Sequence, residues 1–79
     1  MQRAEGIVTV VQEGRFRLLT RHGQSKLFLL AHDANIEAQD LPELQREQTH
    51  VVVQFSDAEH LVAGIAHRLT ESPSSGEPR

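Results

Sequence analysis

The fold is decided by residues 15–32, RFRLLTRHGQSKLFLLAH. Within this stretch Phe16 and Leu18 alternate with arginines, which is typical of a strand that buries one face. A turn at Gly23 leads to a second segment that ends in the apolar run Leu27–Leu30. Two extended segments joined by a glycine turn predict a β-hairpin, and the remaining segments are interpreted as what closes this hairpin into a barrel.

Three further strands are expected from β-branched residues and alternation. Gly14 is expected to supply a positive φ in the turn after the first of them, and Gly64, inside the last, predicts a bulge or bend. Residues 1–5 are expected to be frayed. The three strands are predicted at residues 6–12, 49–55 and 60–69, with a turn at 56–59.

One short helix is predicted over residues 40–48. Asp40 is a good N-cap, Pro42 is tolerated in a first helical turn, and Glu43 completes a pattern close to a capping box. Leu41 and Leu44 lie on one face of that helix and are expected to plug one end of the barrel.

The predicted order, with the helix between the third and fourth strands, is that of a five-stranded OB-fold barrel (β1-β2-β3-α-β4-β5). In an SH3-like barrel the helical turn comes between the fourth and fifth strands instead. We therefore expect an all-β fold with one short helix. It should form a single domain over residues 1–69, followed by a disordered tail over residues 70–79 that is rich in Pro, Ser and Gly.

The layout resembles the small bacterial OB-fold proteins of the S1-like class, which include translation initiation factor one. The resemblance spans about residues 6–69 and rests on sparse positions that are mostly structural. Gln48-Thr49 stands where the class usually has Gly-Asp before strand four. The resemblance implies an OB fold and suggests binding of nucleic acid. The matching positions are Gly6, Val8, Phe16, Arg17, Leu18, Gly23, His32, Val51, Val53, Gly64 and Ile65.

Composition limits the remaining possibilities. The 79-residue chain has no cysteine, so it has neither a disulfide nor a thiolate zinc site. It shows no signal-peptide pattern and no long apolar run, and we expect a cytoplasmic protein without a membrane role. Charge is uneven: residues 1–32 carry five cations and two acids, whereas residues 33–60 carry one cation and seven acids.

The basic first part suggests a binding face on strands two and three. Single-stranded RNA or DNA needs cations for its phosphates and flat side chains for its bases. Phe28 is the aromatic side chain that could be exposed, and an arginine could stack in its place. The predicted nucleic-acid-binding residues are Arg15, Arg17, Arg21, Lys26, Phe28 and His32.

Two other interpretations stay open. The basic face can be an ordinary solvated surface. Alternatively, the barrel is a protein-interaction module or homodimer, using an exposed strand edge or an outer apolar patch. No catalytic motif is present, and we expect no enzymatic activity, cofactor or metal, because the five histidines have no ligand spacing. The residues that would form the apolar patch are Val10, Leu19, Leu29 and Val62.

Overall fold

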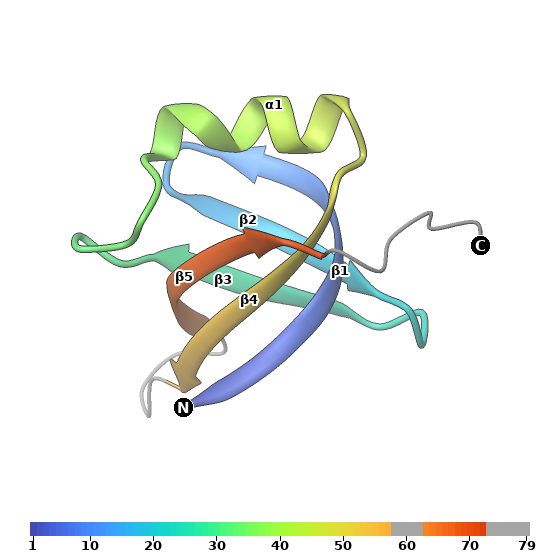
Figure 1. The fold of residues 1–79 in the computed structure, drawn as a ribbon, viewed down its shortest axis with the longest axis horizontal. Coiled ribbons are helices and arrows are strands. Elements are labelled where there is room, and N and C mark those ends of the chain that lie inside the picture. The colour runs from blue at the N-terminus through green and yellow to red at the C-terminus, as the bar shows by residue number, and fades with distance from the viewer. Residues whose placement is uncertain (58–62, 73–79) are drawn as a thin grey trace.

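The computed structural model describes residues 1–57 and 63–72, which form a closed five-stranded mixed barrel with an OB-fold-like layout (Figure 1). The strands follow one another around the barrel in the order β1-β2-β3-β5-β4, and only β3 and β5 pair in parallel. The helical segment lies between β3 and β4, as predicted. The elements are β1 (Gln2–Gln12), β2 (Arg15–Thr20), β3 (Ser25–Leu30), η1 (Ala38–Asp40), α1 (Leu41–Arg46), β4 (His50–Asp57) and β5 (Gly64–Glu71).

β1 is longer than predicted, and the expected fraying of residues 1–5 is wrong for all but Met1. The strand pairs with β4 over Gln2–Ile7 and with β2 from Gly6 onward. Gly6 belongs to both ladders, opposite Thr20 on one side and Val51 on the other. A Cβ at this position would overlap the Leu19 carbonyl oxygen, so the close strand approach requires glycine here.

The helical segment plugs the barrel as predicted but begins earlier. A 3₁₀ turn precedes α1, and the capping box forms one turn upstream, with the Asp40 carboxylate accepting the Glu37 N–H at 2.9 Å. Asp40 therefore caps the 3₁₀ turn and makes no side-chain cap for α1. Leu41 is fully buried, and Leu44 packs against the core from its edge. In Figure 1 the helical segment lies across one end of the barrel.

The core is built around three phenylalanines. Phe28 stacks on Phe16 with ring centroids 5.4 Å apart and meets Phe55 edge-on at 4.9 Å. Gly64 leaves room for this cluster, because an added Cβ would come within 2.9 Å of Phe55 and 3.1 Å of Phe28. The aromatic packing thus explains the glycine at the start of β5. Of the bulge or bend expected there, the structure has a bend at the preceding residue, Ala63, and no bulge at Gly64. The irregularity in the β4–β5 ladder lies at His67, between the Gln54–Arg68 and Phe55–Ala66 pairs.

Other details also differ from the predictions. The positive φ in the β1–β2 turn belongs to Glu13 (58°) and not to Gly14. β5 continues to Glu71, two residues beyond the expected end. β4 runs to Asp57, so the turn predicted at residues 56–59 is wrong for Ser56 and Asp57. Residues 58 and 59 of that turn, residues 60–62 of the predicted fifth strand and the tail from residue 73 lie outside the described residues. In the described part of the chain, no helix has both the length and the apolar character needed to cross a membrane.

Candidate functional site

The outer face of β1, β2 and β3 carries the two arginines predicted from the sequence alternation. Because Phe16 and Leu18 point into the core, Arg15 and Arg17 point outward and are exposed. The ladders place Val10 and Leu27 on either side of Arg17. We call Val10, Gln12, Arg15, Arg17, Leu27 and Leu29 the arginine face.

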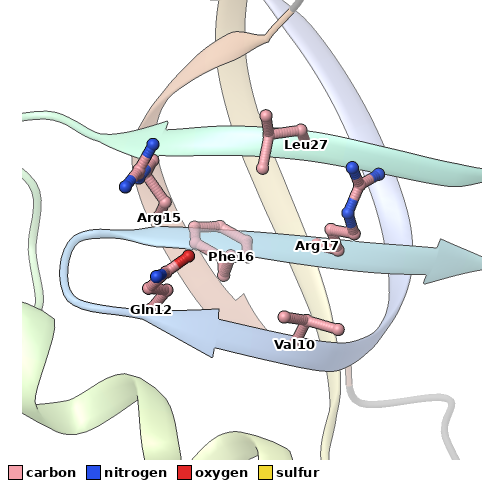
Figure 2. Close-up of a pocket in the computed structure, with 6 residues that line it drawn as sticks. All are labelled: Val10, Gln12, Arg15, Phe16, Arg17 and Leu27. Atoms are coloured by element: carbon pink, nitrogen blue, oxygen red, sulfur yellow. The ribbon is translucent and has the colours of Figure 1, made fainter.

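A hollow of about 210 Å³ lies in the arginine face. Figure 2 shows the two arginines extending from β2 toward β3 on either side of Leu27, with Val10 and Gln12 on β1. Phe16, whose side chain points into the core, lines it from β2. The hollow thus brings the side chains of Val10 and Leu27 together with two guanidinium groups.

The arginine face is also where apolar side chains reach solvent. Apart from Met1, the large apolar residues exposed in the described chain are Val10 (50 %) and Leu19 (41 %). Leu19 lies on the same side of β2 as Arg17, two residues further on. Leu27 and Leu29 on β3 are half-buried beside them. Three of the four residues predicted for an outer apolar patch, Val10, Leu19 and Leu29, thus reach the outer surface, and the fourth, Val62, lies outside the described residues.

Neither arginine of this face is neutralised by a neighbour. Over residues 1–57 and 63–72 the ion pairs are Lys26–Asp57 and Arg46–Glu43. Neither involves Arg15 or Arg17. Two exposed guanidinium groups that have no carboxylate partner in the described part of the chain can bind an anionic ligand.

Lys26 does not share the arginine face, contrary to the expectation. It pairs with Leu18 in the β2–β3 ladder, so its side chain belongs to the inner side of β3. Its ammonium lies 5.2 Å from the centre of the Phe55 ring and 4.0 Å from a carboxylate oxygen of Asp57. Lys26 therefore covers the aromatic core at the edge of the barrel.

The predicted stacking role of Phe28 is wrong. Its ring has no solvent exposure, because Phe28 pairs with Phe16 and shares its inward direction. Phe55 is also in the core, at 4 % exposure, and the sequence has no Tyr or Trp. The described surface consequently offers no aromatic platform for a base.

The remaining predicted residues lie in two other hollows. Arg21 is exposed in the β2–β3 turn and lines a hollow of about 330 Å³ with Arg3 and His22. His32 follows β3 and lines a hollow of about 440 Å³ beside the loop that leads to the helix. The structure therefore brings together Arg15 and Arg17 but separates them from Lys26, Arg21 and Phe28.

The sequence reasoning missed Gln12, which lines the arginine hollow. A two-residue turn at Glu13-Gly14 places Gln12 opposite Arg15 in the β1–β2 ladder. The position of Gln12 beside the arginines could therefore have been predicted from the register of this hairpin. The histidines do not converge: His67 bonds Ser56 at 2.8 Å, and no three His, Asp or Glu side chains of the described residues gather as a metal ion would need. His60 lies outside the described residues.

Two comparisons with known proteins at the level of sequence identify no relative. The sequence matches no protein-family model, and no curated protein is similar to it at a significant level. The similarity to OB-fold proteins is therefore one of layout: a closed five-stranded barrel with a helical plug between β3 and β4.

Proposed function

We propose that this barrel is a protein-interaction module that binds an extended, acidic segment of a partner on the arginine face. The observation that carries the proposal is the combination found there: two guanidinium groups with no carboxylate partner among the described residues, beside a hollow lined by Val10 and Leu27 and next to the exposed Leu19. Carboxylates of the partner would meet Arg15 and Arg17, and its apolar side chains would cover the hollow. Arginine beside apolar residues is a combination enriched at protein interfaces.

Three features support a protein ligand over a nucleic acid. A single strand without stacking partners is held by its phosphates, and this face supplies only two cations. All three phenylalanines of the chain are in the core. The helical segment, which packs beside β1, adds Glu37, Asp40, Glu43 and Glu47 against Arg46. This acidic neighbour would repel a polyanion that extends beyond the arginine face, whereas a peptide whose carboxylates lie only over Arg15 and Arg17 avoids it.

Single-stranded RNA or DNA is the second candidate function. It is supported by the position of the two arginines on the β2–β3 face, which OB folds commonly use for oligonucleotides. An arginine can stack on a base while it contacts a phosphate. On this alternative, oligonucleotide affinity would fall steeply with salt concentration.

The test compares both ligand classes on one set of proteins. A display library of random peptides is selected on the wild-type protein, and oligo(dT) and oligo(U) are titrated by fluorescence anisotropy at low salt. We expect selected peptides rich in Asp and Glu, each losing roughly tenfold in affinity with Arg15→Ala or Arg17→Ala. Arg68→Ala, at an exposed position of β5, is the matched control and should bind as wild type.

Two outcomes would reject the proposal. Selected peptides without acidic preference, or with equal affinity for the alanine variants, would remove the arginine face from the function. Tight oligonucleotide binding that depends on Arg15 and Arg17, with no peptide selected, would establish the second candidate instead.

A further inference from the structure

We infer that the ligand continues from the arginine face past the β1–β2 turn into a second, apolar hollow. The bound partner segment would then have two parts: carboxylates over Arg15 and Arg17, and one large apolar side chain a few residues away. This inference rests on the proposed function and specifies the chemistry of the partner.

The second hollow lies between the β1–β2 turn and the loop that connects β3 to the helical segment. Its volume is about 440 Å³. Its lining takes apolar side chains from Leu30, Ala31, Ala34, Ile36 and Ala38 and polar ones from His32 and Glu37, with Gly14 at the turn. Leu30 and Ile36 are only partly buried and rest on the core. We call this site the apolar hollow. Its size and lining suit a leucine, isoleucine or phenylalanine side chain better than a charged group.

The apolar hollow and the arginine face are adjacent. Gly14 lines the apolar hollow, and the next residue, Arg15, lines the arginine hollow. Opposite them, the Leu30 N–H donates to the Gly14 carbonyl at 2.8 Å, and Leu29 pairs with Arg15. The two sites therefore meet across one row of the β2–β3 hairpin, with no intervening element in the described chain.

The hairpin also fixes the spacing that a partner must have. Three residues separate Arg17 from Gly14 along the strand, which is roughly 10 Å at the rise of an extended chain. An extended peptide covers that distance in about three residues. We therefore expect the apolar residue to lie about three to five residues from the carboxylate that meets Arg17.

Charge favours a partner protein over other occupants of the apolar hollow. Glu37 lies at the edge of this hollow and would repel a phosphate backbone, and it confines the partner's carboxylates to the arginine face. The last seven residues of the sequence, PSSGEPR (73–79), contain no large apolar residue to fill it. A second copy docked face to face would bring the unpaired arginines of both copies together.

Gly14 provides a selective way to fill the apolar hollow. A Cβ added there would meet no atom within 4 Å, and Gly14 does not adopt a positive φ. Gly14→Leu should therefore fold while its side chain occupies the space beside Leu30. Gln24→Leu is the matched control, because it adds a similar side chain at an exposed position of the other hairpin turn.

The experiment uses the peptides selected on the wild-type protein. We expect them to carry a large apolar residue at the stated spacing, and Gly14→Leu to weaken them about tenfold while Gln24→Leu does not. Binding should also shift the methyl NMR signals of Leu30 and Ile36 but leave those of the core residue Leu41 in place. Circular dichroism melts of both variants establish that they are folded.

The failures can be told apart. Acidic peptides that depend on Arg15 and Arg17 but ignore Gly14→Leu would overturn this inference and leave the proposed function intact. If no acidic peptide is selected, both fail. If oligonucleotides shift the NMR signals of residues in both hollows, the ligand of this surface is a nucleic acid. If the signals shift when only the concentration of the protein is raised, the ligand is a second copy of the chain. Either result overturns the inference.

Discussion

Gln48, which follows the end of the helix, has a strained left-handed backbone conformation. The helix ends in a Schellman motif, in which the N–H groups of Gln48 and Thr49 donate to the Gln45 and Leu44 carbonyls at 3.1 and 3.2 Å. The motif requires a left-handed residue, and Gln48 has φ of 53°. Glycine adopts this conformation without the clash of a Cβ, so glycine is the residue best suited to this place.

We therefore expect Gln48→Gly to stabilise the protein. Glycine removes the free-energy cost of the left-handed conformation in the folded state, and it also lowers the free energy of the more flexible unfolded chain. The first effect is larger by about 0.5–1 kcal/mol, which would raise the Tm by roughly 2–8 °C in a domain of this size. Thermal unfolding followed by circular dichroism measures it. Glu47→Gly is the control, because Glu47 has φ of −91° and gains nothing from glycine. A Gln48→Gly variant no more stable than wild type would contradict this account.

At the same scale, Phe28 and Lys26 mark the limit of the sequence prediction. The run Leu27–Leu30 is continuously apolar, so it lacks the alternation that would say which side chains face the core. Only the pairing with Phe16 decides this, and it turns Phe28 inward together with Lys26. For β2, where arginines alternate with Phe16 and Leu18, the sequence assigned both faces correctly.

Among the elements, β5 is held at its edge by a side chain. β3 pairs with β5 only up to Ala66. Beyond that point Asn35 takes the place of a strand: its amide donates to the Leu69 carbonyl at 2.7 Å and accepts the Leu69 N–H at 2.9 Å. The loop before the helical segment thus completes the hydrogen bonding of β5.

Asn35→Asp should destabilise this contact. The carboxylate keeps the bond from the Leu69 N–H but loses the donor to the Leu69 carbonyl and repels that oxygen, which costs about 1–3 kcal/mol in a partly buried place. The measurement is urea unfolding, together with hydrogen exchange of the Leu69 amide. Gln24→Glu adds the same charge at an exposed position and should change stability little. Equal stability of the two variants would refute the role of Asn35.

The sequence predicted which elements form better than where they begin. Pro42 and the leucines after Asp40 were sufficient to predict the helix from the sequence. The 3₁₀ turn at Ala38–Asp40 could not be predicted in this way, because it buries no residue and therefore shows no apolar periodicity. The N-terminal half of β1, from Gln2 to Glu5, has few β-branched residues. It is a strand because β4 pairs with it, which is a tertiary effect that local propensity does not contain.

The whole molecule is a cylinder with one weak seam. β3 and β5 share three residue pairs, whereas every other neighbouring pair of strands shares five to seven. This seam is also the parallel one, and parallel pairing is slightly less stable per residue. The barrel is therefore expected to open between β3 and β5 before it unfolds globally.

Native-state hydrogen exchange tests this order of opening. The Ala31 amide, which bonds the Ala66 carbonyl at 2.9 Å across the seam, should exchange through a smaller opening free energy than the amide of Val53 in β4, which pairs on both sides. If Ala31 exchanged only through global unfolding, the seam would be as strong as the rest of the barrel.

The bare apex at Gly14 gives this barrel a route to new specificities. A longer hairpin there would add a wall to both hollows, and a side chain added at Gly14 would meet no atom within 4 Å. The backbone bond from the Leu30 N–H to the Gly14 carbonyl is the contact that a longer turn has to keep. Lengthening a surface loop is inexpensive in free energy. Under the proposed function, loop grafting at this turn should change which partner binds while the free energy of unfolding stays nearly constant.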